Sequence, residues 1–223
     1  MLILITLTWI LFGKNSLAYY ASPTGGGACL SGTDFVQTRY GLMEVQDIQV
    51  GTKVLAVGQD QKLSWSPVVF LFHAPNNEHR LGIEISLESG SAFTVTPQHT
   101  VIISPQCQPE DFPQLQSVLA EQLQEGTCLF QVSPDLSGIR IEKIASLKPK
   151  YTNGIYNPIT KEGTIVVNNV TLSAYSYVDH KQGHLKFAKF YKFSKPSQKA
   201  FQAYVHSANF DIEKDLEGLM KYY

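Results

Sequence analysis

The sequence predicts an all-β fold, and two observations lead to this prediction. Between residues 29 and 178 of the 223-residue chain, short runs rich in Val, Ile, Phe and Thr alternate with turn-forming Gly, Pro, Asn and Asp residues. The helical patterns of roughly 10–15 residues that separate the strands of a parallel sheet are missing from this region. The pattern is therefore typical of a sandwich or barrel of short strands.

The expected strands are short and end at turn residues. They include residues 52–57, 67–72, 81–87, 92–95, 100–103, 128–132, 139–144 and 164–167. The breaks between them lie at Gly51, residues 58–60, residues 74–77, Gly90 and Gly163. One helix is expected within the region, over residues 114–123, because Leu115, Leu119 and Leu123 recur every four residues.

The N-terminal segment differs in composition from the rest. Residues 1–13 are apolar apart from two threonines, Lys14 follows, and Ser16-Leu17-Ala18 offers a cleavage site of the small-x-small type. This predicts a signal peptide over residues 1–18, and hence the secretory pathway and an extracellular location. The alternative is an uncleaved N-terminal anchor. A polar, small-residue peptide, residues 19–28, then leads to Cys29.

The C-terminal segment, residues 179–223, contains a run in which every third residue is a lysine. Lys186, Lys189, Lys192 and Lys195 recur beside Phe187, Phe190 and Phe193. On a helix this spacing makes a basic stripe next to an aromatic stripe, which Pro196 ends; residues 198–220 are expected to form further helix. The segment either packs its aromatic side chains on the β-domain, or contacts a membrane surface or an apolar adduct.

Composition narrows the classes of function. A net charge of -1 makes nucleic acid a poor partner. The three cysteines, Cys29, Cys107 and Cys128, are too few for a disulfide scaffold, and their odd number leaves at least one thiol. Cys107 and Cys128 either form a bridge or are inert core residues. No Cys or His spacing supports a metal site, and no cofactor is expected.

Cys29 is the candidate nucleophile, directed at its own preceding peptide bond, Ala28–Cys29. A thiol that attacks an upstream amide needs deprotonation, donors for the oxyanion and a proton for the departing amine. Residues 93–99 end in a Thr-x-x-His turn that can aim Thr96 and His99 at one peptide bond. We expect His99 to protonate the Cys29 nitrogen, and Thr96 to polarise the Ala28 carbonyl.

Three blocks of the sequence resemble a known family. The first comprises residues 29–41, 45–48 and 51–55; the second, residues 90–94 with Thr96 and His99; the third, residues 158–168 continued by 173–175. In this order they are similar to the Hint superfamily of hedgehog C-terminal (Hog) domains and inteins. The resemblance implies a horseshoe-like all-β fold and an N-to-S acyl shift at Cys29, assisted by Thr96 and His99. In hedgehog proteins a sterol then attacks the thioester.

At a few positions the sequence departs from the family pattern, and the first of these bears on the acceptor of the acyl group. Where a Hog domain has an aspartate that activates the sterol hydroxyl, this chain has His73, which follows Leu71-Phe72. A neutral imidazole can serve as a general base, so His73 either activates an alcohol or a water, or is a turn residue with no role. Ala174 stands at the place of a second family cysteine. Residues 167–170 lack the histidine and nucleophile of a splicing intein.

The expected organisation is a signal peptide (1–18), a short peptide (19–28), a Hint autoprocessing domain (29–178) and a tail (179–223) resembling a reduced sterol-recognition region. The expected function is single-turnover self-cleavage, with a sterol-like alcohol, another small nucleophile or water as acceptor. The alternative is a catalytically degenerate Hint domain that acts as an extracellular binding module. A cysteine protease acting in trans is disfavoured, since Cys29 does not open a helix within a papain-like motif.

Overall fold

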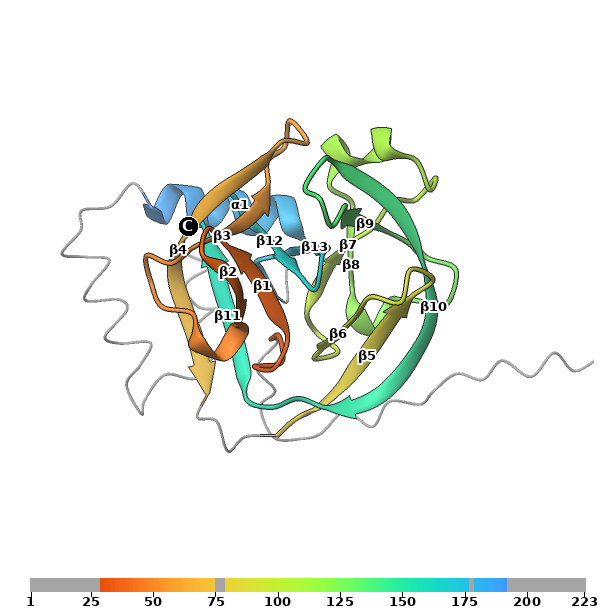
Figure 1. Cartoon of the computed structure of the whole chain (residues 1–223), viewed down its shortest axis with the longest axis horizontal. Coiled ribbons are helices and arrows are strands. Elements are labelled where there is room, and N and C mark those ends of the chain that lie inside the picture. The colour runs from red at the N-terminus through yellow and green to blue at the C-terminus, as the bar shows by residue number, and fades with distance from the viewer. Residues whose placement is uncertain (1–28, 75–78, 177–178, 192–223) are drawn as a thin grey trace, which may run out of the picture.

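The computed structural model describes residues 29–74, 79–176 and 179–191, with side chains placed except at 73–74 and 186–191. A single curled sheet of eleven strands is the largest element of this part of the chain, and a two-stranded sheet and one helix pack against it. Figure 1 shows the sheet bent around on itself, with the long strand β10 sweeping along one side and β4 and β11 on the other. The expectation of an all-β, horseshoe-like fold with a helix at its C-terminal side is confirmed.

The elements follow the chain in this order: β1 Phe35–Thr38, β2 Gly41–Glu44, the 3-10 helix η1 Val45–Asp47, β3 Lys53–Val57, β4 Leu63–Ala74, β5 Leu81–Leu87, β6 Ala92–Val95, β7 Thr100–Ile102, η2 Pro109–Gln114, β8 Ser117–Leu119, η3 Ala120–Gln122, β9 Cys128–Val132, β10 Ile139–Tyr151, β11 Ile155–Thr160, β12 Thr164–Val167, β13 Val170–Ser173 and α1 His180–Tyr191. In the large sheet the strands lie in the order β11-β4-β3-β1-β12-β13-β9-β10-β5-β6, and β2 pairs with β1.

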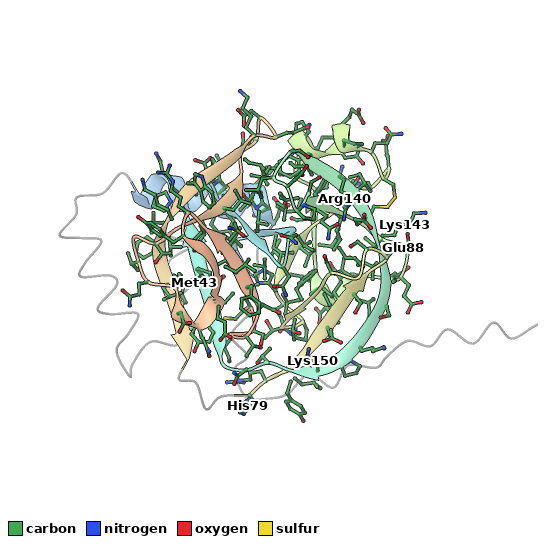
Figure 2. The ribbon with its side chains drawn as sticks, in the orientation of Figure 1. Met43, His79, Glu88, Arg140, Lys143 and Lys150 are labelled. Carbon is green, nitrogen blue, oxygen red and sulfur yellow. A yellow bond between two sulfur atoms is a disulfide. The ribbon has the colours of Figure 1, made fainter. Side chains whose placement is uncertain are left out.

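The core lies where the sheet curls over itself. Every residue of β9, β12 and β13 is buried, because these strands are covered on both faces. A tight turn at Asn168 and Asn169 joins β12 to β13, and both residues have positive φ, as a primed hairpin turn requires. By contrast, β10 keeps one face in solvent: Lys143 and Lys150 point outward while Ile144 is buried (Figure 2).

The two ends of the large sheet meet at residue 30. Leu30 forms antiparallel bridges both to Val95 at the end of β6 and to Tyr156 in β11, which are the last and first strands of the sheet order. Its amide donates to the Tyr156 carbonyl (2.8 Å), and the neighbouring Ser31 amide donates to the Thr94 carbonyl (3.0 Å). The segment that begins at Cys29 therefore closes the sheet into a ring.

The prediction of a helix over residues 114–123 is wrong. The structure has the 3-10 helices η2 and η3 there, separated by β8, and Leu115 adopts a left-handed conformation with φ of 44°. Pro113 removes a helical donor, and β8 pairs with β7 over three residues, so tertiary pairing overrides the four-residue leucine spacing. Leu115 and Leu123 are nevertheless buried, which explains their apolar character.

The predicted helix of the tail is present in part. α1 begins at His180 and is described to Tyr191, so the residues that follow, including Pro196 and the second expected helix, lie outside the described part. The lysine and phenylalanine side chains of its two stripes also lie outside it. So do the expected signal peptide and the peptide up to Ala28. Among the described residues no helix has the length and apolarity to cross a membrane.

Candidate active site

Cys29 lies at the seam where the sheet closes. Its side chain is 2% exposed, and its carbonyl oxygen accepts a hydrogen bond of 3.0 Å from the Thr96 amide. The next residues are held on both sides, by β6 and by β11, and the Gly32 amide donates to the Asn153 carbonyl (2.8 Å). The backbone around the candidate nucleophile is thus fixed by hydrogen bonds to segments far away in the sequence.

Thr96 contacts the peptide unit that the proposed reaction would break. The Cys29 amide nitrogen donates to Thr96 Oγ1 at 2.7 Å, and this hydroxyl lies 3.4 Å from the Cys29 carbonyl oxygen, to which it donates. Thr96 is 2% exposed. The structure therefore brings Cys29 and Thr96 together, with the hydroxyl at the amide nitrogen of Cys29; Ala28 lies outside the described residues.

The Thr96–His99 turn is present as the sequence predicted, and backbone hydrogen bonds from η3 hold it in place. The His99 amide donates to the Thr96 carbonyl (3.1 Å) across Pro97 and Gln98. The residues of η3 cover the turn, because the Ala120 amide donates to the His99 carbonyl (2.9 Å) and the Glu121 amide to the Pro97 carbonyl (3.0 Å). Both candidate side chains of the turn are consequently held on one rigid element.

His99 is fully buried, and burial sets its protonation state. Desolvation lowers the pKa of its imidazole to about 4, and the nearby backbone of Ser173 acts in the opposite direction. Its Nδ1 lies 3.3 Å from Ser176 Oγ, whereas its Nε2 has no hydrogen-bond partner among the described residues. A neutral imidazole with one unused ring nitrogen is able to accept a proton and return it.

His73 is placed only through its backbone. It pairs with Tyr156 across β4 and β11, and Tyr156 in turn bridges to Leu30. His73 therefore stands at a register position two strands from the Cys29 segment. Its side chain is outside the described part of the structure, so its role as a base stays a prediction.

Sequence reasoning missed a buried polar cluster beside the site. Asp34 accepts from the Thr94 amide (2.8 Å) and from Asn168 Nδ2 (2.9 Å), and Asn168 Nδ2 also donates to the Ala92 carbonyl (2.6 Å). Desolvation raises the pKa of Asp34 to about 6, although both hydrogen bonds act to lower it. The cluster ties β1, β12 and β6 together around the Cys29 segment, and no local spacing in the sequence pairs Asp34 with Asn168.

Helix α1 docks on the segment that also faces His99. His180 is buried, with Nδ1 3.0 Å from Ser173 Oγ, and His184 Nδ1 lies 3.0 Å from the Tyr175 hydroxyl. A Cβ added at Gly183 would lie 2.6 Å from Cγ of Tyr175, so only glycine allows this approach.

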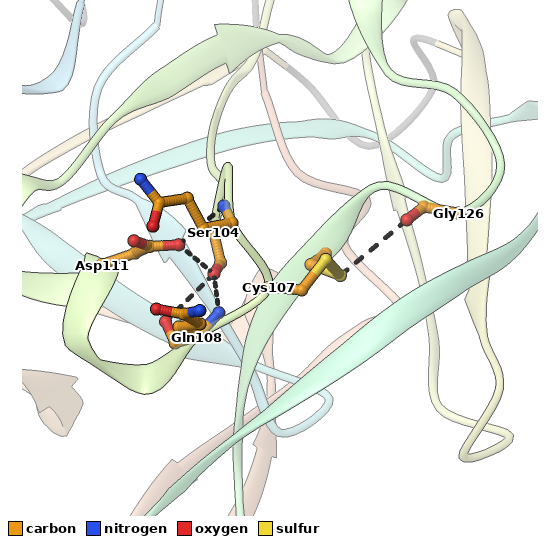
Figure 3. The surroundings of a disulfide bond; sticks show 7 residues. Ser104, Cys107, Gln108, Asp111 and Gly126 are labelled. Carbon is orange, nitrogen blue, oxygen red and sulfur yellow. Dashed lines mark hydrogen bonds between the residues drawn. A yellow bond between two sulfur atoms is a disulfide. The ribbon is translucent and has the colours of Figure 1, made fainter.

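The remaining cysteines form a disulfide away from this seam. Cys107 and Cys128 are bridged, with a Cα–Cα distance of 5.3 Å, and Cys29 stays a thiol. Figure 3 shows the bridge beside a turn in which Ser104 Oγ donates to Asp111 (2.7 Å). Within the described ranges, no group of three or more His, Cys, Asp or Glu side chains is arranged to hold a metal ion.

Comparison with known proteins assigns the chain to a family. The family model of the Hint module matches residues 18–218, which is most of the chain. The chain belongs to the Hint family. Similar curated proteins include Warthog protein 6 of Caenorhabditis elegans, 28% identical over 75% of this chain, and protein hedgehog of Drosophila melanogaster, 25% identical over 60%. In both, this Hint chain spans about a quarter (27%) of the relative's length.

Solved structures support the same fold at low sequence identity. The gp41-1 intein superposes with a TM-score of 0.51 and 19% identity, covering 66% of this Hint chain and 99% of the intein. A DnaB intein from Synechocystis sp. PCC 6803 gives a TM-score of 0.55 with 14% identity, covering 67% and 99%. Family membership and these likenesses together support a self-processing domain in general terms.

Proposed function

We propose that this Hint domain cleaves itself by an N-to-S acyl shift at the Ala28–Cys29 bond. The Cys29 thiol loses its proton, a bond forms between Sγ and the Ala28 carbonyl carbon, and the bond from that carbon to the Cys29 nitrogen breaks. The nitrogen gains a proton and becomes an amine, so no net proton is released. The hydrogen bond of 2.7 Å from the Cys29 nitrogen to Thr96 Oγ1 carries this proposal.

Thr96 and His99 have separate roles in the proposed step. Thr96 Oγ1 accepts from the Cys29 N–H and so holds the amide nitrogen in place. His99 accepts the thiol proton and returns it to the nitrogen, and its neutral state follows from a pKa lowered to about 4. General acid–base transfer of this kind is worth roughly 10²–10⁴ in rate.

A second nucleophile must then resolve the thioester. We assign this step to a sterol-like alcohol, another small nucleophile or water, activated by His73. The position of His73 in β4, joined through β11 to the Cys29 segment, supports this assignment. The tail from residue 179 onward, through contact with a membrane surface or with the acceptor, is the proposed acceptor-binding region.

We further propose that the domain works in the secretory pathway. The Cys107–Cys128 disulfide supports this location, because structural disulfides persist in oxidising compartments and are rare in the cytosol. The apolar N-terminal segment of the sequence points the same way.

The test is intact mass spectrometry of a fusion that places a small reporter before residue 19. Incubation of the folded fusion with dithiothreitol is expected to release the reporter at Ala28–Cys29, and Cys29→Ala is expected to release none. An unchanged mass in folded wild-type protein would overturn the enzyme function and leave the binding module. Release from Cys29→Ala as well would assign the cleavage to a contaminating protease.

The acceptor is tested in the same fusion without dithiothreitol. Added cholesterol is expected to increase the mass of the released reporter by that of the sterol ester, whereas water yields the free acid. His73→Ala is expected to abolish this second step while thiol-induced release continues, because thiols need no activating base at His73. Unaltered resolution in His73→Ala would contradict the role of His73.

A further inference from the structure

His99 has one side-chain partner in the described structure, and the backbone fixes it. Ser176 Oγ lies 3.3 Å from His99 Nδ1, although 77 residues separate the two in sequence. Their backbones also pair as an antiparallel bridge, which places the two side chains beside each other by register. Ser176 is 7% exposed and His99 is fully buried, so bulk water does not compete for this contact.

The hydrogen bond between Ser176 and His99 bears on the chemistry, because it involves only one of the two ring nitrogens of His99. Nε2 is buried and accepts or donates no hydrogen bond within the described part of the chain, whereas Nδ1 faces Ser176. In a neutral imidazole one nitrogen carries the proton and the other holds a lone pair, and the hydrogen bond at one nitrogen decides which is which. Ser176 Oγ either accepts from a protonated Nδ1 or donates to an unprotonated one, and the two arrangements correspond to the two tautomers of His99.

We propose that Ser176 is a positioning residue that fixes the tautomer and orientation of His99. Its hydroxyl oxygen accepts from Nδ1–H, which leaves the lone pair on Nε2. Nε2 then takes the proton from the Cys29 thiol and passes it to the departing Cys29 nitrogen. This inference rests on the proposed self-cleavage, and it adds the residue that prepares the base and the ring nitrogen that moves the proton.

The kinetic test uses the reporter fusion with Ser176→Ala and Ser176→Thr. Loss of the hydroxyl is expected to slow thiol-induced release by about tenfold, because the imidazole then divides between tautomers and orientations. Ser176→Thr keeps the hydroxyl and is expected to recover most of the rate. An unchanged rate in Ser176→Ala, or a rate in Ser176→Thr as low as in Ser176→Ala, would overturn the role of the hydroxyl.

A matched control separates positioning from packing. Ser66 is also a buried serine, and its Oγ accepts one hydrogen bond, from the Glu162 amide (3.0 Å). Ser66→Ala is expected to lose a similar amount of stability without slowing release. If Ser66→Ala slowed release as much as Ser176→Ala, the slower release would be explained by lost stability, and the inference would be wrong.

Nitrogen NMR tests the tautomer without any turnover. In the Cys29→Ala fusion with ¹⁵N-labelled histidine, the ring resonances of His99 are assigned by their loss in a further His99→Gln variant. We expect a protonated Nδ1 and an unprotonated Nε2, and a shift toward the other tautomer when Ser176→Ala is added. A protonated Nε2 with Ser176 intact would overturn the inference even if the domain cleaves itself. Absence of cleavage with the expected tautomer would instead overturn the proposed function.

Discussion

The amide nitrogen of Cys29 donates a hydrogen bond of 2.7 Å to the hydroxyl of Thr96, 67 residues further along the chain. The contact forms because the Cys29 segment fills the gap between β6 and β11, and Thr96 directly follows β6. It links the closure of the sheet to the peptide unit proposed to break. The contact between Cys29 and Thr96 therefore depends on closure of the sheet.

Thr96→Val tests this link. Valine keeps the shape but removes the acceptor for the Cys29 amide, so thiol-induced release of a reporter is expected to slow by about a hundredfold. Loss of a buried hydrogen-bond partner is also expected to lower the free energy of unfolding by about 1–3 kcal/mol. Thr96→Ser keeps the hydroxyl and serves as the control. Equal release rates in Thr96→Val and wild type would show that the hydroxyl has no part in the reaction.

The pH dependence of cleavage follows from the burial of His99. With its pKa lowered to about 4, the imidazole stays neutral from neutral pH down to mildly acidic pH. A histidine of ordinary pKa would lose about tenfold of its neutral form between about pH 7.5 and 5.5. We expect the release rate to stay nearly constant over this range when the thiolate concentration is held fixed. A tenfold fall with a midpoint near the ordinary histidine pKa would contradict the buried, neutral His99.

Stability is expected to fall as the solution is acidified below the ordinary histidine pKa. The pKa values of His99 and His180 are both lowered from 6.5 to about 4 by burial, so between these values the unfolded chain binds two more protons than the folded one. Asp34 offsets one of these two protons. Burial raises its pKa from 3.8 to about 6, so between these values the folded state keeps a proton that the unfolded state has released. The unfolded chain therefore binds about one proton more than the folded chain in this range. The free energy of unfolding is expected to fall by about 1.4 kcal/mol for each pH unit of acidification.

Urea denaturation at a series of pH values measures this slope. His180→Gln removes one of the two histidines and is expected to make the free energy of unfolding nearly independent of pH over the same window. A slope in His180→Gln as steep as in wild type would show that His180 titrates alike in the folded and unfolded states. Both proteins need to be intact, so the measurement is made on the Cys29→Ala background.

Gly183→Ala tests the docking of α1. Intrinsic helix propensity favours alanine over glycine by about 1 kcal/mol, yet Gly183 is buried and the new Cβ would meet the ring of Tyr175 at 2.6 Å. We expect the clash to win, with a net loss of about 1–3 kcal/mol and faster amide hydrogen exchange within α1. Gly138→Ala is the control, since a Cβ at Gly138 meets no heavy atom within 4 Å. Unaltered exchange in Gly183→Ala would mean that α1 does not pack on Tyr175 in solution.

The disulfide is expected to stabilise the fold without taking part in the chemistry. The bridge spans 21 residues, for which chain entropy predicts a stabilisation of about 3 kcal/mol. The double variant Cys107→Ser, Cys128→Ser is expected to unfold at a lower temperature and, in the assay without dithiothreitol, to release the reporter at the wild-type rate while folded. Loss of release from the folded variant, monitored by circular dichroism at the assay temperature, would give the disulfide a role in the site.

Local sequence patterns predicted most of the strands but not their partners. Residues 81–87, 92–95, 128–132 and 164–167 coincide with β5, β6, β9 and β12, because short β-branched runs bounded by turn residues determine their own conformation. The expected helix at residues 114–123 failed, since pairing of β8 with β7 is a long-range contact that leucine spacing does not record. Strands β1, β2, β11 and β13 were not among the strands named from the sequence.

The sequence by itself determined the family, the Thr-x-x-His turn and Cys29 as the candidate nucleophile, because each is recorded in short blocks of neighbouring residues and in the order of those blocks. Only the tertiary structure decided that Leu30 closes the sheet, that Ser176 faces His99, that Asn168 meets Asp34 and that Cys107 pairs with Cys128. The physical reason is that these contacts join segments far apart in the chain. They exist only once burial of the ring's core holds those segments together.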